Sequence, residues 1–253
     1  MMSLISPPII LIGMHRSGTS LLARILDRAG IFMGYDLTED HESWYFQRIN
    51  TAWMSAEGWT WDHPGEPTQA DMKLFDEISF LRHYVRVSRQ PMKPFSFLSA
   101  NTWGWKDPRN TFTIHQWKKK FPKAKIIHIY RNGMDVAISL YKRNLGMDFT
   151  NKWYSQRLEN KLEGLKLWEE YAAKAFGYDQ QFPGQVHHLS FEKLIANDTQ
   201  TILKLESVVN CELTSLVKSL TDNERTARFN SDEHTDLKEF AQHSEWMHKL
   251  NYL

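Results

Sequence analysis

The sequence predicts an α/β fold in which a central parallel sheet is covered by helices on both faces, a three-layer sandwich. Short apolar runs, such as residues 9–12 and 124–130, are typical of strands buried on both faces, and amphipathic helical patterns follow them. Each of these two runs ends in a turn, at Gly13 and at residues 131–133. Strand, tight turn and helix therefore recur in the order that builds a parallel sheet.

The remaining elements extend this alternation along the chain. The four expected strands are the short runs at residues 9–12, 103–106, 124–130 and 186–189. The expected helices carry apolar residues at helical spacing and cover residues 21–29, 44–54, 68–89, 111–121, 134–145, 152–176 and further stretches from 191 onward. Because no repeat or dividing linker interrupts them, we expect a single domain over residues 1–253.

Composition excludes several classes of protein. The 253 residues are 42% hydrophobic, which is enough for a sizeable core, and contain 31 Lys and Arg against 30 Asp and Glu. This balance gives no overall field that would attract nucleic acid. The apolar stretch 7–14 is far shorter than the roughly 20 residues of a membrane span, and no secretion signal is recognisable. With Cys211 as its single cysteine, the chain is expected to be cytoplasmic and to lack disulfides.

Residues 13–20, of sequence GMHRSGTS, form the turn between the first strand and its helix. Gly13 and Gly18 have the spacing of a nucleotide-binding P-loop, whose backbone N–H groups and helix dipole attract an anion. The lysine that reaches the β- and γ-phosphates in such loops is replaced by Thr19. A positive charge lies within the loop instead, at Arg16, which suits a 5′-phosphosulfate better than a triphosphate with its metal.

A second anion site is predicted where the strand 124–130 ends. Arg131 follows this strand at the sheet edge onto which the glycine loop also opens. Ser139 lies about two helical turns further along, so both side chains are able to face one anion. The pair therefore suits a second phosphate, separate from the first.

These segments resemble the motifs of the sulfotransferase superfamily. The loop GMHRSGTS is similar to the 5′-phosphosulfate-binding loop, in the variant with Arg in place of Lys, and YRNGMDVAIS at 130–139 resembles the 3′-phosphate motif. GWKDPR at 104–109 is similar to a strand-end motif of bacterial sulfotransferases. SFEKL at 190–194 resembles a weakened Tyr-Glu-Asp-Leu element, which is mainly structural. The resemblance covers roughly residues 9 to 195 and implies a P-loop NTPase-like fold.

The resemblance also implies an activity and the residues that support it. It implies transfer of a sulfuryl group from 3′-phosphoadenosine-5′-phosphosulfate (PAPS) to a hydroxyl or amine of a small-molecule, carbohydrate or lipid acceptor. The nucleotide product is 3′-phosphoadenosine-5′-phosphate (PAP), and no metal is required. The residues implied in donor binding are Arg16, Ser17, Gly18, Thr19, Ser20, Arg131 and Ser139. Independently of the resemblance, an aromatic-rich segment offers either the lining of an acceptor pocket or simple packing, with Trp44, Tyr45, Trp53, Trp59 and Trp61.

Sulfuryl transfer requires cations and a base, as phosphoryl transfer does. Arg16, within the glycine loop, and Lys106, at the end of another strand, are the expected cations. The segment HESWYF at 41–46 resembles the Lys-Glu and aromatic residues of carbohydrate sulfotransferases, and this resemblance makes Glu42 the candidate base. His41 is adjacent and is an alternative base, as are other residues that include His115.

Two other classes of protein remain open at this stage. A P-loop kinase or NTPase would share the glycine loop but would need a lysine at position 19 and an acid for Mg²⁺, for which Asp107 is the candidate at a strand end. A non-catalytic nucleotide-binding protein would keep the fold without turnover. The 11 histidines show no metal-binding spacing of the H-E-x-x-H type, so no metal site is expected.

Overall fold

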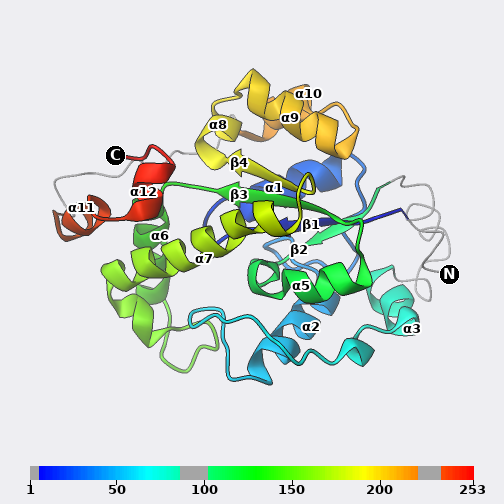
Figure 1. Cartoon of the computed structure of the whole chain (residues 1–253), viewed down its shortest axis with the longest axis horizontal. Helices are drawn as coiled ribbons and strands as arrows, with labels where there is room; N and C mark the ends of the chain where they lie inside the picture. Colours follow the sequence, from blue (N-terminus) through cyan, green and yellow to red (C-terminus); the bar gives the residue numbers. More distant parts are fainter. Residues whose placement is uncertain (1–5, 86–101, 222–234) are drawn as a thin grey trace.

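The computed structural model describes residues 6–85, 102–221 and 235–253 and has a parallel sheet at its centre (Figure 1). In these residues the sheet has four strands in the order β2-β1-β3-β4. They are β1 (Ile9–Ile12), β2 (Gly104–Lys106), β3 (Lys125–Tyr130) and β4 (Val186–Ser190). All three pairings are parallel, and β1 lies between β2 and β3, with Leu11 opposite both Lys106 and Ile127. The predicted strands and the α/β fold class are confirmed.

The side chains of β1 point alternately into two hydrophobic layers, one on each face of the sheet. Ile9 and Leu11 pack on the face covered by α1 (Thr19–Arg28), α8 (Phe191–Ile195), α9 (Thr199–Val209) and α10 (Thr214–Thr221). Ile10 and Ile12 pack on the opposite face, against aromatic residues of α2 (Trp44–Ser55) and α5 (Asn110–Lys120) and the C-terminal part of α7 (Lys161–Gln181). Because successive side chains of a strand point to opposite faces, a fully apolar strand is buried between two helical layers.

A third group of buried residues lies beyond the end of the sheet. It joins α7 to α6 (Gly133–Leu145), and α11 (Thr235–Ala241) and α12 (Glu245–Lys249) pack against it. In Figure 1 these helices stand together near the C-terminus. In the part of the chain that the structure describes, no helix combines the length and the apolar character needed to cross a membrane.

The single helix predicted over residues 68–89 is wrong within the described residues. The chain instead forms three short turns, η2 (Met72–Leu74), α3 (Glu77–Ser79) and the π-helical η3 (Phe80–Tyr84). Asp71 and Asp76 interrupt the expected helix because each side chain accepts a hydrogen bond from a backbone N–H two or three residues later. Each aspartate therefore starts a new turn. Residues 86–89 of the predicted helix lie outside the described residues.

The long helix predicted from residue 152 begins later. A 3-10 turn, η4 (Gln156–Glu159), comes first, and α7 starts only at Lys161. The side chain of Asn160 accepts a hydrogen bond from the N–H of Leu162 and caps the helix. Residues 146–155 consequently form a connection across the surface, and part of it lines a cavity described below.

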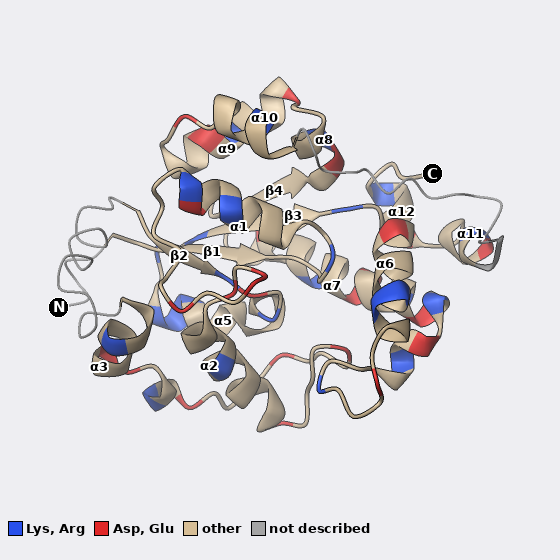
Figure 2. Cartoon of the chain, turned by 180° about the vertical axis from the view of Figure 1, so that it is seen from behind, with Lys and Arg blue, Asp and Glu red and all other residues tan. Residues whose placement is uncertain are grey.

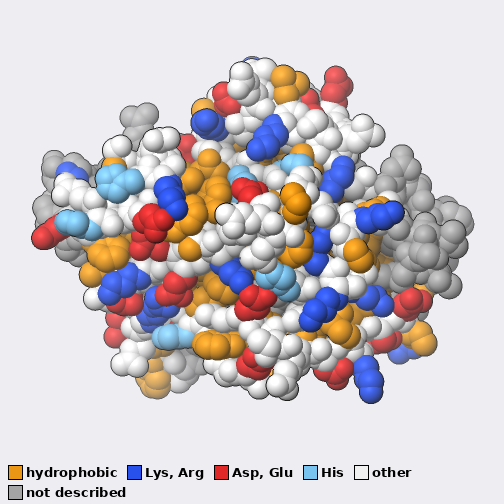
Figure 3. All heavy atoms as spheres, in the orientation of Figure 1, with side chains coloured by type: hydrophobic (Ala, Val, Ile, Leu, Met, Phe, Trp, Pro, Cys, Tyr) orange, Lys and Arg blue, Asp and Glu red, His pale blue; other side chains and the backbone are white. Residues whose placement is uncertain are grey.

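Charged residues of both signs are intermingled over the faces drawn in Figures 2 and 3. This distribution agrees with the nearly equal numbers of basic and acidic residues in the sequence. An anion site must therefore arise from a local arrangement of cations.

Candidate active site

The loop between β1 and α1 has a backbone that requires glycine at two positions. Gly13 has φ 139° and Gly18 has φ 92°, both in the region that side chains disfavour. A Cβ atom at Gly13 would lie 2.4 Å from the carbonyl oxygen of Ile129, and one at Gly18 would lie 2.2 Å from the ring of Phe191. The loop therefore packs directly against β3 and against the start of α8. This packing holds it at the carboxyl edge of the sheet, at the N-terminus of α1.

Replacing Gly18 with alanine is expected to destabilise the protein by roughly 2–4 kcal/mol, because it combines a strained backbone with a steric clash. Gly30 offers a matched control, since it has φ 86° but a Cβ atom added there would have no atom within 4 Å. Gly30→Ala should show the backbone cost alone, roughly 1–2 kcal/mol. Thermal unfolding of both variants measures the difference. Equal losses would show that the contact with Phe191 is unimportant.

A cavity of about 210 Å³ opens above this loop. Seven of the predicted site residues line it, namely Arg16, Gly18, Thr19, Ser20, Glu42, Lys106 and Arg131. Ser139 lies beside it, because its Oγ accepts a hydrogen bond of 2.9 Å from Nε of Arg16. Ser17 is buried, and its Oγ has no hydrogen-bond partner among the described residues. The structure thus brings the two predicted phosphate motifs to one cavity.

Arg131 joins the second motif to the first. One of its terminal nitrogens lies 3.4 Å from the carbonyl oxygen of Arg16, which accepts from it, and the other lies 3.3 Å from Oδ2 of Asp135. Its guanidinium carbon lies 4.7 Å from the centre of the Phe191 ring. Burial raises the pKa of Asp135, while the charge of Arg131 opposes this shift. Asp135 therefore orients the guanidinium of Arg131, and the cap of α6 is supplied by the side chain of Asn132.

Glu192 holds the second motif, residues 130–139, in position. Its Oε1 accepts a hydrogen bond of 2.8 Å from the backbone N–H of Asn132, at the start of α6. Its Oε2 accepts hydrogen bonds from the hydroxyls of Ser190 and Tyr252, at 2.9 and 2.8 Å. The predicted structural element at 190–194 thus supports the turn that carries Arg131, and the C-terminal Tyr252 contributes to it.

Glu42 and Lys106 form a buried ion pair at the wall of the cavity. Nζ of Lys106 lies 3.0 Å from Oε1 of Glu42 and 3.3 Å from Oγ of Ser20, to which it also donates. Both side chains are buried, and Lys106 is only 1% exposed. The other oxygen of Glu42 accepts a hydrogen bond of 2.6 Å from Gln47 and lies 3.7 Å from a terminal nitrogen of Arg109. Glu42 does not cap α2, because the side chain of Ser43 does so.

The two histidines considered as alternative bases lie elsewhere. His41 has φ 57°, and its Nε2 lies 3.5 Å from Oδ2 of Asp27. His115 is on α5 and contacts Glu66 and Gln181. Neither histidine is part of the cavity lining above the glycine loop. Of these three residues, Glu42 alone lines the cavity above the glycine loop.

Asp107, the acid that a kinase-like site would need, uses its carboxylate in a network of buried hydrogen bonds. It is buried, accepts a hydrogen bond of 2.8 Å from the side chain of Asn50, and binds both the backbone and the side chain of Arg109. Within the described ranges, no group of three or more His, Cys, Asp or Glu side chains is arranged to hold a metal ion. Thr19 stands where a kinase would have its lysine.

The site predicted from the sequence did not include His15 or Arg143. The ring contact between His15 and Trp61 was not predicted either. The His15 ring packs edge-on against Trp61 with 5.0 Å between ring centres, and its buried Nε2 lacks a partner among the described residues. Burial lowers the pKa of His15 well below its usual value, and the nearby cations, of which Arg143 contributes most, lower it further. Arg143 lines the cavity above the glycine loop and lies four residues after Ser139. This i, i+4 spacing on a predicted helix is the signal that could have found it.

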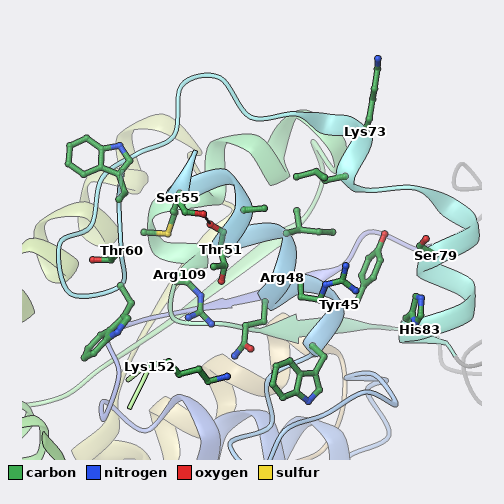
Figure 4. Close-up of a pocket in the computed structure, with 18 of the residues that line it drawn as sticks. Tyr45, Arg48, Thr51, Ser55, Thr60, Lys73, Ser79, His83, Arg109 and Lys152 are labelled. Atoms are coloured by element: carbon green, nitrogen blue, oxygen red, sulfur yellow. Dashed lines mark hydrogen bonds between the residues drawn. The ribbon is translucent and has the colours of Figure 1, made fainter. Parts of the chain in front are cut away.

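A second, larger cavity of about 830 Å³ lies beside the first (Figure 4). Four of the five aromatic residues predicted for an acceptor pocket line it: Trp44, Tyr45, Trp59 and Trp61. Trp53 is instead buried in the core against Trp117, at 4.6 Å between ring centres. Gln47 and Arg109 line the larger cavity and also contact Glu42, which lines the smaller one. Glu42 therefore stands between the two cavities.

The fold and the site define a P-loop-like α/β protein with a cationic site at the carboxyl edge of its sheet. A model of the sulfotransferase family matches residues 7–215, and the chain belongs to this family, which places it among the transferases. Among solved structures it is similar to a sulfotransferase from Alicyclobacillus acidocaldarius, with 17% sequence identity over 94% of this chain and 92% of that chain and a TM-score of 0.56. This likeness supports the fold.

Two further similarities complete the comparison. The sulfotransferase domain from the curacin biosynthetic pathway has 15% sequence identity over 81% of this chain and 75% of that chain, with a TM-score of 0.47. An uncharacterized protein of Aquifex aeolicus (strain VF5) is 25% identical over 217 residues, which cover 81% of this chain and 25% of that protein. The chain therefore spans about a quarter of the length of this curated relative.

Proposed function

We propose that residues 1–253 form one sulfotransferase domain that transfers a sulfuryl group from PAPS to a hydroxyl or amine of an acceptor bound in the larger cavity. The observation that carries this proposal is the position of Glu42. Its carboxylate contacts Lys106 on the side of the glycine loop and Gln47 and Arg109 on the side of the larger cavity. A base in this position can take a proton from an acceptor and remain next to the donor.

The residues around the smaller cavity fit a donor with two separated phosphates. The N-terminus of α1, a helix of 10 residues, offers backbone N–H groups to the 5′ side, together with Arg16, Ser17, Gly18, Thr19 and Ser20. The buried Oγ of Ser17 and Nε of Arg131 lack partners among the described residues and are ready to bind phosphate oxygens. Arg131 and Ser139 would hold the 3′-phosphate. The hydroxyl oxygen of Ser139 accepts the hydrogen bond from Arg16, so the hydroxyl hydrogen remains available to donate to a phosphate oxygen.

The chemistry then depends on position and charge. PAPS supplies the sulfuryl group and a leaving 5′-phosphate. Glu42 accepts the proton of the acceptor hydroxyl as the new S–O bond forms and the S–O bond to the 5′-phosphate breaks. Lys106 and Arg16 line the cavity assigned to the donor and would stabilise the negative charge that accumulates on it. Lys106 also holds the carboxylate of Glu42 in place, which fixes the direction from which the acceptor approaches.

His15 would take part through a neutral ring. Its pKa is lowered by burial and by the surrounding cations, so it carries no charge at neutral pH. Its unpartnered Nε2 is therefore able to exchange a hydrogen bond with the transferred group without adding another cation to the site.

Isothermal titration calorimetry with PAP and with ATP–Mg²⁺ tests the donor. PAP is expected to bind at least tenfold more tightly, because Arg131 and Ser139 provide for a 3′-phosphate and the loop lacks the lysine that holds a γ-phosphate. Preference for ATP–Mg²⁺ would contradict the proposal in favour of a kinase or NTPase. Transfer of radiolabel from PAPS to a panel of acceptors separates an active enzyme from a non-catalytic nucleotide-binding protein.

A further inference from the structure

The larger cavity combines aromatic rings with an uneven distribution of charge. Its lining includes four basic residues, Arg48, Lys73, Arg109 and Lys152, but a single acid, Asp76. The carboxylate of Asp76 is engaged at the start of α3, where it accepts a hydrogen bond of 2.8 Å from the N–H of Ser79. Basic side chains therefore outnumber acidic ones in this lining, although Arg109 is also paired with Asp107 behind it.

Two of these cations are directed to the same place. Figure 4 shows the side chains of Arg109 and Lys152 extending into one part of the cavity, whereas Lys73 extends away from it. The guanidinium carbon of Arg109 lies 5.5 Å from the ring centre of Trp153, and Nζ of Lys152 lies 5.3 Å from the same ring centre. Nζ of Lys152 is also 5.5 Å from the ring centre of Trp44. These indole rings hold the two cations near each other.

Both cations have donor capacity to spare. Arg109 is 4% exposed, and its Nε donates to Asp107, but one of its terminal nitrogens has no hydrogen-bond partner among the described residues. The nearest carboxylate oxygen on that side, Oε2 of Glu42, is 3.7 Å away and already accepts from Gln47. Lys152 has no acidic partner within 4.0 Å in the described part of the chain. The buried, unpartnered nitrogen of Arg109 marks a place where a ligand oxygen would bind, and the exposed Lys152 adds a second positive charge near it.

We propose that the acceptor is a small ring-bearing organic acid whose carboxylate binds between Arg109 and Lys152. This inference rests on the proposed function, because it assigns a substrate class to the same site. The ring packs among the indoles of the lining, and the hydroxyl that receives the sulfuryl group reaches Glu42, 3.7 Å from Arg109. The cavity, at about 830 Å³, has ample room for a ligand of this size.

Matched acids and esters test the proposal in protein saturated with PAP. The probes are 4-hydroxybenzoate, 4-hydroxyphenylacetate and glucuronate, each compared with its methyl ester by calorimetry and by quenching of tryptophan fluorescence. At least one acid is expected to bind tenfold or more tightly than its ester, because the ester keeps the ring and hydroxyl but loses the charge. The phenolic and sugar acids distinguish an aromatic ring from a carbohydrate ring.

Two lysine variants test whether Lys152 causes the preference for the acid over its ester. Lys152→Met should reduce the preference for the acid about tenfold while leaving the affinity for the ester unchanged. Lys73→Met is the matched control, since it removes one lysine from the same lining that points elsewhere, and it should keep the full preference. Equal preference in the two variants would overturn the assignment of Lys152.

The outcomes separate this inference from the proposed function. The substrate class is wrong, and the proposed donor site is unaffected, if PAP binds but every ester binds as well as its acid. The same conclusion follows if PAP binds but no acid binds in the millimolar range. If PAP itself fails to bind, the proposed function fails first. Transfer of radiolabel from PAPS to the preferred acid, with none to its ester at equal concentration, would support both.

Discussion

Replacing Glu42 with glutamine is expected to lower the rate of sulfuryl transfer by about 10²- to 10⁴-fold, the usual loss when a general base is removed. Glutamine keeps the size of the side chain, and its one amide oxygen can still accept a hydrogen bond from Lys106, while its NH₂ group replaces the oxygen that accepts from Gln47. It cannot take a proton from the acceptor. Affinity for PAP should stay the same or rise slightly, because Lys106 loses the negative charge that neutralises it. Single-turnover transfer and calorimetry with PAP measure the two quantities.

Asp40→Asn is the matched control for this variant. Asp40 also lines the smaller cavity and is also an acid, but it is exposed and lies two residues before Glu42. Its replacement should change the transfer rate far less. Circular dichroism and thermal unfolding check that Glu42→Gln is folded, since the change leaves buried Lys106 without its ionic partner. A folded Glu42→Gln protein with nearly full turnover would exclude Glu42 as the base.

Replacing Arg131 with alanine is expected to weaken PAP binding by about tenfold to a hundredfold, which corresponds to the loss of a charge-assisted contact. Binding of AMP, which lacks the 3′-phosphate, should change much less. The reason is that Arg131 sits at the junction of the two motifs, with its Nε unpartnered among the described residues and its plane held by Phe191 and Asp135. Calorimetry with both nucleotides gives the ratio of the two losses.

Lys142→Ala serves as the control for Arg131→Ala, because it removes an exposed cation from the same helix, α6, outside the cavity. Its effect on both nucleotides should be small and equal. Arg131→Lys adds a second test, since it keeps the charge but not the planar group that packs on Phe191. Equal losses of PAP and AMP affinity in Arg131→Ala would contradict a role in binding the 3′-phosphate.

The sequence predicted the strands well because their signal is local. A run such as Ile9–Ile12 is apolar at every position, and only burial on both faces accounts for that pattern. The segment 68–89 shows the limit of periodicity. Its apolar spacing fits a helix, but Asp71 and Asp76 bind the backbone locally and divide it. Competition between a side chain and the helix for one N–H is decided by small energies that spacing does not reveal.

The meeting of the two predicted phosphate motifs at one place was also accessible from sequence. Both follow strand ends, so the parallel sheet brings them to one edge whatever the rest of the chain does. The larger cavity was accessible only in part. Its aromatic residues are concentrated between 44 and 61, but Arg109, Lys152 and Trp153 reach it from segments far along the chain. Which of these side chains meet depends on how the helical layers pack, and a single sequence does not encode that in any local pattern.

The sequence by itself determined the fold class and the position of the glycine loop, because these follow from strand burial and from the glycine turn at the end of the first strand. The tertiary structure alone separated Glu42 from His41, which are neighbours in the chain. The left-handed backbone of His41 turns its ring toward Asp27, while the carboxylate of Glu42 is held by Lys106 from β2 and Gln47 from α2. Those partners come from elements up to 64 residues away, and packing brings them together.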